Sequence, residues 1–254
     1  MLRTEGLTKN FGGLVAVDEV DFHLESDELC SLIGPNGAGK TTFFDLLTGT
    51  LTPTAGTVEF RVDGEYRDVT GAAPDEIARH GLHRSYQLTN IFPTNTVLEN
   101  VRVAAQAHGS DSGRIWRNVG AFEEYLEEAH SILERVGLSE HAHESAETLS
   151  HGEKRHLEVA IALAGDPDLL LLDEPNAGVS SESVGEVVDL IEDVATDHAV
   201  LLVEHNMDIV MEVSDRIVVL HQGSIIADDD PAAVRDDETV QQAYLGGYES
   251  EVEA

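Results

Sequence analysis

Gly34-Pro35-Asn36-Gly37-Ala38-Gly39-Lys40-Thr41-Thr42 is the stretch from which the fold and the chemistry of this chain can be worked out. It fits the pattern G-x-x-x-x-G-K-[ST] of a phosphate-binding loop. The apolar run 29–33 before it predicts a buried strand, and the segment 42–47 after it predicts a helix. Glycines let the backbone approach phosphates without a Cβ in the way, while loop N–H groups and the helix N-terminus face the anion.

We therefore expect all nine residues of this loop to contact a nucleotide. Lys40 has the length to reach the β- and γ-phosphates, and the Thr41 hydroxyl is a ligand for Mg²⁺. The alternative is a glycine-rich turn that precedes a helix by chance, and the matching strand and helix on either side argue against it.

Length and composition favour one large α/β domain, or a core with a subdomain. The chain has 254 residues, 41% of them hydrophobic, which is enough for a sizeable core. No apolar run approaches the roughly 18 residues of a membrane helix, and the N-terminus has no apolar signal region, so we expect a soluble intracellular protein. The single cysteine, Cys30, lies in an apolar strand and is interpreted as a small core residue.

The charge is strongly acidic, with 49 Asp and Glu against 15 Lys and Arg and a formal net charge of −34. Such a surface repels nucleic acid, so no nucleic-acid partner is expected. The acids are spread along the whole chain, as in proteins of salt-loving microbes. At molar salt the screening length falls to about 3 Å, so the repulsion between these acids would largely vanish. An ordinary acidic cytosolic protein is the alternative interpretation.

The pattern along the chain divides it into three kinds of segment. Residues 2–8, 14–24 and 57–61 alternate apolar and polar positions, which predicts an antiparallel sheet with turns at 11–13 and at Asp63-Gly64. Residues 82–87 predict a strand with a polar end, and residues 88–163 have a helical pattern. Strand and helix patterns then alternate, which predicts a parallel sheet with crossover helices. The alternating segments are 169–172, 184–195, 200–203, 207–213 and 217–220.

Two adjacent carboxylates, Asp173 and Glu174, end the predicted strand 169–172. Ligands of α/β proteins bind at the carboxyl ends of such strands. Asp173 is suited to hold Mg²⁺ directly or through water, and Glu174 to polarise the water that attacks the γ-phosphate. A solvated acidic turn is the alternative, and the phosphate-binding loop upstream makes it the weaker one.

Ser150 and Glu153 fit a capping box at the start of a predicted helix, and locally that explains them fully. The same helix N-terminus also suits a second anion. His205 follows the predicted strand 200–203 and is placed to donate to a γ-phosphate, although a lone histidine is more often a cap or a surface residue. Phe11 on its own is an ordinary aromatic of a core or turn.

Taken together, these motifs resemble the ATP-binding subunits of ABC transporters over nearly the whole chain. Residues 34–42 are similar to the Walker A loop, Gln87 to the Q-loop glutamine, 149–153 to the signature motif, 169–174 to Walker B and His205 to the switch histidine. The resemblance implies a P-loop NTPase core with a mostly parallel sheet, an N-terminal antiparallel β-subdomain and an inserted α-helical subdomain. It implies one domain over 1–254, with 1–87 and 164–254 as the core and 88–163 as the helical subdomain.

The resemblance also assigns roles and partners. Phe11, at the position of the adenine-stacking aromatic, and Val17 would contact ATP, and Gln87 would join Thr41 and Asp173 as a ligand of Mg²⁺. The catalytic residues would be Glu174, His205 and Gln87. The resemblance implies a head-to-tail dimer, with a second copy or a paralogue, in which Ser150 and Gly152 of one subunit contact the ATP of the other. Transmembrane permease subunits would hold this dimer at the cytoplasmic face of the membrane.

Finer features look like the ATPases of branched-chain amino acid importers. They are the segments 11–17, 93–101, 204–207, 214–217 and 243–246. In such a system an extracytoplasmic binding protein acts indirectly on the ATPase. Urea and short-amide importers are close relatives, and a lipid exporter or a non-transport ABC protein is a more distant alternative. The signature motif departs from many relatives at His151 and Glu153, and the run 176–180 lacks the aspartate usual after Walker B.

Overall fold

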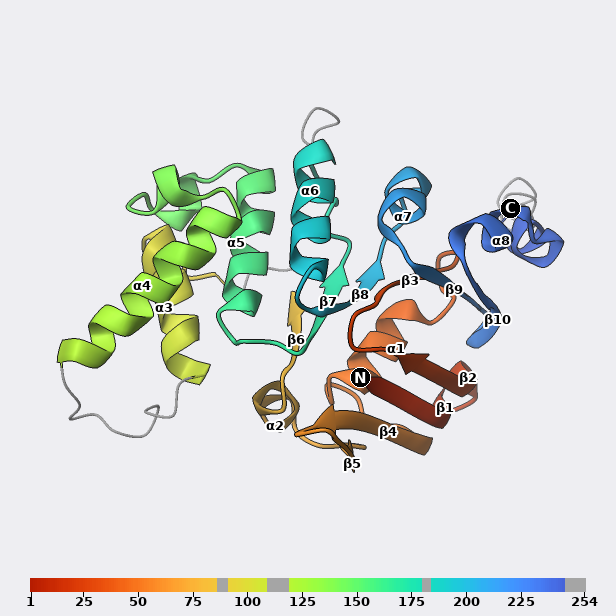
Figure 1. The fold of residues 1–254 in the computed structure, drawn as a ribbon. Helices are drawn as coiled ribbons and strands as arrows, with labels where there is room; N and C mark the ends of the chain where they lie inside the picture. Colours follow the sequence, from red (N-terminus) through yellow and green to blue (C-terminus); the bar gives the residue numbers. More distant parts are fainter. Residues whose placement is uncertain (86–90, 109–118, 180–183, 245–254) are drawn as a thin grey trace.

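The computed structural model describes residues 1–85, 91–108, 119–179 and 184–244, and Figure 1 shows how their helices and strands are arranged. A six-stranded sheet forms the centre. A four-stranded sheet and helix α1 cover one of its faces, and the remaining large helices gather on the other side.

The central sheet has the strand order β10-β9-β3-β8-β7-β6, and all its strands are parallel except β10. Strands β3, β7 and β8 are buried at every residue, because parallel strands covered on both faces are apolar throughout. The predicted α/β fold class is confirmed. The strands are β3 (Leu29–Ile33), β6 (Leu82–Ser85), β7 (Leu169–Asp173), β8 (Ala199–Val203), β9 (Arg216–His221) and β10 (Ser224–Asp229).

The second sheet is antiparallel, with the order β2-β1-β4-β5. The turns predicted at 11–13 and 63–64 lie where the sequence places them. Gly56 has a φ of +83°, and a Cβ there would come within 2.3 Å of the carbonyl oxygen of Gly6, so this position accepts no side chain. The strands are β1 (Leu2–Phe11), β2 (Leu14–Leu24), β4 (Ala55–Val62) and β5 (Glu65–Asp68).

Helices connect the strands and form a block at one end of the central sheet (Figure 1). They are α1 (Lys40–Leu47), α2 (Pro74–Arg79), α3 (Val97–His108), α4 (Val119–Arg135), α5 (His151–Leu163), α6 (Val184–Ala195), α7 (Met207–Val213) and α8 (Pro231–Asp236), with short 3₁₀ turns η1 (Ser139–His141) and η2 (Ala146–Thr148). Helices α3, α4 and α5 make up the helical block. Among the described residues, no helix has the length and apolar character to cross a bilayer.

The central sheet separates two hydrophobic cores. Along β7, Leu169 and Leu171 face the core shared with α1 and the antiparallel sheet, whereas Leu170 and Leu172 face the core of the helical block and α6. This alternation follows from the two-residue period of a strand. Strand β7 therefore contributes side chains to both of these cores.

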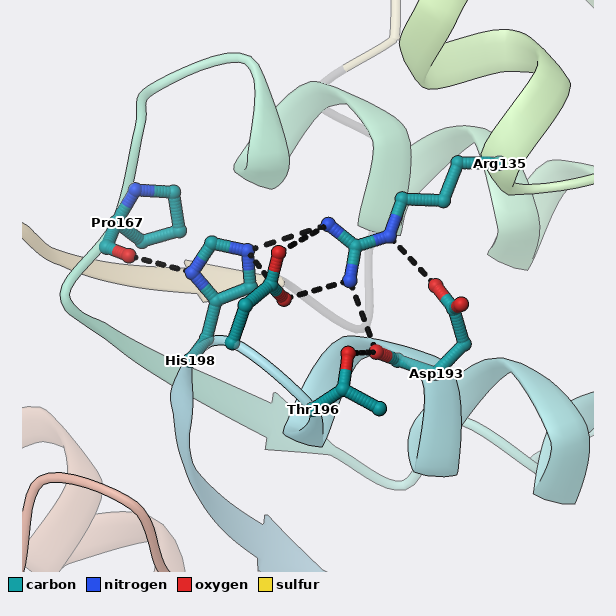
Figure 2. Close-up of polar contacts among 6 residues, drawn as sticks. Arg135, Pro167, Asp193, Thr196 and His198 are labelled. Carbon is teal, nitrogen blue, oxygen red and sulfur yellow. Dashed lines mark hydrogen bonds and ion pairs between the residues drawn. The ribbon is translucent and has the colours of Figure 1, made fainter.

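Arg135, the last residue of α4, joins the helical block to α6 and to the turn that follows α6 (Figure 2). Its guanidinium donates to the carboxylates of Asp193 at 2.5 Å and Asp197 at 2.7 Å, and to the carbonyl oxygen of Asp193 at 2.8 Å. Beside it, Nδ1 of His198 donates to the carbonyl oxygen of Pro167 at 2.7 Å. These bonds tie together α4, the end of α6 and the segment before β7.

The segments identified from the sequence end at residue 220, and the structure adds one strand beyond them. Strand β10 pairs with β9 through a turn at Gln222-Gly223, whose φ angles are 50° and 87°. Positive φ at both central residues is the mark of a two-residue hairpin turn, and glycine at the second position was the available signal. The strand predicted over 82–87 is described as far as Ser85, and Gln87 lies outside the described residues.

Cys30 gives a simple test of the central sheet. Its side chain is fully buried in β3, and burial raises the pKa of its thiol. Because the thiolate is the reactive form, we expect no reaction with a disulfide reagent such as DTNB in the native protein and one titrated thiol after unfolding in guanidinium. Free cysteine at the same pH is the control, and prompt labelling of the folded protein would contradict the placement of β3.

Candidate functional site

The loop 34–39 joins β3 to α1 and needs glycine at two positions. Gly34 has a φ of +153°, and a Cβ there would lie 2.1 Å from the carbonyl oxygen of Leu220. Gly39 has a φ of +108°, and its Cβ would lie 2.2 Å from the carbonyl oxygen of Ala16. Both contacts are with backbone, so neither can be relieved by a side-chain movement. The loop is packed between β9 and the first hairpin, and its shape depends on both.

Lys40, the first residue of α1, is buried and folds back onto the loop. Its Nζ donates to the carbonyl oxygens of Gly34 at 2.6 Å and Pro35 at 3.1 Å. Burial lowers the pKa of Lys40, and the negative charges of Glu174 and Asp173 oppose that shift. The ammonium group is thus held inside the loop, next to both carboxylates.

The N-terminus of α1 is open to an anion. Gly39 is the N-cap and supplies no side-chain cap, so in the described part of the chain no capping side chain occupies the N–H groups of the first turn. Thr41 is exposed and Thr42 is half-buried. The remaining loop residues, Pro35, Asn36, Gly37 and Ala38, line an open pocket with the segment 239–243.

Asp173 and Glu174 lie where β7 ends. Asp173 is 7% exposed. Glu174 has a φ of +49°, a left-handed conformation that costs about 1–3 kcal/mol for a residue with a side chain. The following Pro175 increases the strain, because a residue before proline favours extended backbone. Strain of this kind persists only where neighbouring contacts hold it.

His205 comes from the end of the adjacent strand β8 and meets Glu174. Its Nε2 lies 2.7 Å from Oε1 of Glu174, a hydrogen bond between two half-exposed side chains. The structure therefore brings together two of the three residues predicted as catalytic. The third, Gln87, lies outside the described residues.

Sequence reasoning missed Arg84, which lies in β6 and is almost completely buried. Its guanidinium donates to Oδ2 of Asp173 at 2.5 Å and to Oδ1 of Asp45, on α1, at 2.6 Å, and it packs 5.4 Å from the centre of the Phe44 ring. Burial opposes the charge, but the hydrogen bonds to Asp173 and Asp45 outweigh burial and raise the pKa of Arg84. An arginine inside the predicted strand 82–87 was the available signal for such a pair.

Phe11 and Val17, both predicted to contact the nucleotide, lie in different environments. Phe11 is 50% exposed at the tip of the first hairpin, with Nζ of Lys9 5.2 Å from the centre of its ring. Val17 is fully buried in the core beneath that hairpin, and its assignment to the nucleotide stays a prediction. The residue before it, Ala16, is the one whose backbone touches Gly39.

Ser150 and Gly152 lie apart from the loop. Ser150 caps α5, because its Oγ accepts from N–H of Glu153 at 3.2 Å while its own N–H donates to Oε2 of Glu153 at 2.7 Å. The predicted capping box is confirmed. Both residues line an open groove of about 920 Å³ between the helical block and α6, and no residue of the loop 34–42 belongs to its lining.

Comparison with known proteins agrees with this geometry. A family model described as "ABC transporter" matches residues 17–177, and one described as "Branched-chain amino acid ATP-binding cassette transporter" matches residues 224–250. The second match covers β10, which sequence reasoning missed, and α8.

Individual relatives align along nearly their whole length. The "High-affinity branched-chain amino acid transport ATP-binding protein LivG" of Salmonella typhimurium is 41% identical, covering 97% of this chain and 98% of that protein. The "Lipopolysaccharide export system ATP-binding protein LptB" of Haemophilus influenzae is 32% identical, covering 97% of each. The crystal structure of the ADP conformation of MJ1267, an ATP-binding cassette of an ABC transporter, has a TM-score of 0.81 and 30% identity, covering 97% of this chain and 98% of that one.

Proposed function

The chain belongs to the ATP-binding subunits of ABC transporters and is an ATPase of that family, and from this premise we propose that it energises the import of branched-chain amino acids. The alignment with LivG over almost the full length of both chains is the observation that carries the substrate class. The match of residues 224–250 to a branched-chain amino acid model supports the same class.

We propose that the edge of the central sheet formed by the loop, Asp173, Glu174 and His205 is where ATP is hydrolysed. Lys40 and the first-turn N–H groups of α1 would bind the phosphates, with Lys40 exchanging loop carbonyls for phosphate oxygens. Glu174 would accept a proton from the attacking water, and His205 would orient Glu174 and donate toward the γ-phosphate. Gln87 is proposed as the third residue of this set. Phe11 is proposed to stack on the adenine.

Oxygen ligands at this edge suit Mg²⁺. We propose Thr41, Asp173 and Gln87 as its protein ligands, because a hydroxyl, a carboxylate and an amide oxygen are the donors that this ion prefers. No group of three His, Cys, Asp or Glu side chains that could hold a metal ion occurs among the described residues. When bound, Mg²⁺ neutralises charge on the β- and γ-phosphates.

We propose that two such subunits form a head-to-tail dimer with a second copy or a paralogue. Ser150 and Gly152 line a groove to which no residue of the loop 34–42 contributes. Any contact of these two residues with ATP would therefore be with ATP bound to the loop of a partner subunit. Permease subunits would hold the dimer at the cytoplasmic face of the membrane, and an extracytoplasmic binding protein would deliver the substrate.

Uptake by the assembled transporter tests the substrate class. Complexes co-purified from the native host and placed in proteoliposomes should take up labelled leucine when ATP is supplied, and should not take up labelled urea. Urea uptake without leucine uptake would favour the short-amide alternative. Export of a lipid would favour the runner-up function, for which the 32% identity to LptB is the supporting observation.

Replacing Lys40 by alanine tests the phosphate site directly. We expect the affinity for ATP to fall about 10- to 100-fold, because a charge-assisted hydrogen bond contributes about 1.5–3 kcal/mol. Titration of the chain with a fluorescent ATP analogue measures it. Lys154→Ala is the matched control, since Lys154 donates to the carbonyl oxygen of Glu147 in the helical block. An unchanged affinity in Lys40→Ala would count against the loop as the phosphate site.

A further inference from the structure

The strained backbone at Glu174 is held from both sides by the end of β8. The N–H of Glu174 donates to the carbonyl oxygen of Val203 at 2.8 Å. Two residues on, the N–H of Asn176 donates to Oε1 of Glu204 at 2.8 Å. Glu174 and Pro175 thus lie between two hydrogen bonds to consecutive residues, which fix where this turn begins and ends.

Glu204 binds a second segment with its other oxygen. Its Oε2 accepts from the N–H of His205 at 3.0 Å and from the N–H of Asn206 at 3.4 Å. Glu204 is only 4% exposed, so its carboxylate has little access to water and depends on these N–H groups as partners. One carboxylate therefore joins the segment that carries Glu174 to the segment that carries His205.

We propose that Glu204 is a positioning residue for hydrolysis, which holds Glu174 in its left-handed conformation and sets its 2.7 Å contact with His205. Glu204 itself does not face the reacting atoms, since its two oxygens are turned toward backbone N–H groups. This inference rests on the proposed function for the roles of Glu174 and His205, whereas the clamp on the backbone is independent of it.

A carboxylate is required at this position. Its two oxygens only accept hydrogen bonds, and all three partners are donors. In glutamine an NH₂ group replaces one of the two oxygens. An NH₂ group cannot accept a hydrogen bond from an N–H, so the side chain would lose either its bond from Asn176 or its bonds from His205 and Asn206. The substitution E204Q keeps the size of the side chain and removes one end of the clamp.

The test measures E204Q in the full chain and in the assembled transporter. We expect kcat for ATP to fall on the order of 10- to 100-fold, because small misplacements of catalytic groups have effects of that size, while the affinity for ATP stays within about twofold. In a Glu174→Gln background, E204Q should cause no further loss, since residues that act through one another are not additive. Backbone amide exchange at Asn176 and His205 should become faster.

Glu28→Gln is the control, because Glu28 is also a half-buried glutamate that accepts a backbone N–H, from Glu25 at 2.8 Å, and it lies just before β3, where it pairs with Arg216. It should leave kcat unchanged even where it lowers the melting temperature. Glu204→Asp, which keeps the charge but is shorter, serves if E204Q fails to fold, and it should also lose kcat without losing ATP affinity.

The proposal is overturned if E204Q keeps kcat within about twofold of wild type, or if its loss of kcat is matched by Glu28→Gln. Unchanged amide exchange at Asn176 and His205 in E204Q would by itself show that the Glu204 carboxylate does not hold the two segments together. A wild-type transporter that does not hydrolyse ATP would instead remove the proposed function, and the exchange measurement would still decide whether Glu204 holds the two segments.

Discussion

Replacing Glu174 by glutamine is expected to reduce ATP turnover by about 10²- to 10⁴-fold while leaving ATP binding intact. The amide cannot accept a proton from the attacking water, whereas Lys40 and the N-terminus of α1, which would bind the phosphates, are unchanged. Glutamine has nearly the same shape as glutamate, so residue 174 can still form its hydrogen bond with His205 at the observed distance of 2.7 Å. ATP would be held without being cleaved, and the closed dimer should accumulate.

Turnover is measured as phosphate release by the assembled transporter, and the dimer by size-exclusion chromatography with ATP present. Glu212→Gln, on the exposed side of α7, removes the same charge away from the site and should behave like wild type. Turnover near wild type in Glu174→Gln would remove Glu174 as the general base. Loss of ATP binding in the same variant would show that the carboxylate also supports the loop.

Replacing Arg84 by methionine is expected to lower the free energy of unfolding by about 3–5 kcal/mol. Arg84 and Asp173 have side chains only 7% and 8% exposed, so removing the guanidinium leaves a buried carboxylate without its cationic partner. Asp45, which is 24% exposed, loses a partner as well. Methionine fills much of the volume next to Phe44, so the loss measured is mainly electrostatic.

Urea unfolding of the isolated chain, followed by circular dichroism, measures the change. Arg67→Met is the matched control, because Arg67 pairs with Asp63 on the surface, where removal costs about 0–1 kcal/mol. A similar small effect of both substitutions would mean that the buried pair contributes little. Since Asp173 is a proposed ligand of Mg²⁺, Arg84→Met should also change the Mg²⁺ concentration needed for half-maximal turnover.

The parts of the site that are local in sequence could be predicted, and the parts that depend on distant segments could not. The loop 34–42 and the two carboxylates at the end of β7 were recognisable because spacing and flanking pattern specify them. Arg84 and Asp173 are 89 residues apart, and nothing near either one indicates the other. Glu204 was assigned no role because its partners are backbone N–H groups, which carry no sequence signal of their own.

The assignment of Val17 to the nucleotide stays a prediction, because the contact observed near it is made by backbone. What approaches the loop is the carbonyl oxygen of Ala16, and a backbone contact cannot be read from the side chain beside it. The alternation along the first hairpin decides which of the two neighbours points inward, and an irregular register there shifts it. The halophilic interpretation of the net charge of −34 stays a prediction.

The position of β3 in the middle of the central sheet has a consequence for synthesis of the chain. Strand β3 pairs only with β8 and β9, both near the C-terminal end, and Gly34 packs against the carbonyl oxygen of Leu220. On the ribosome, β3 emerges long before those partners, on the order of 10–40 s earlier at about 5–20 residues per second. During that interval the nucleotide loop lacks its contact with β9, and of its two packing partners only the first hairpin is present. A nascent chain that stops before β9 should therefore have no ATP site, however complete its motifs.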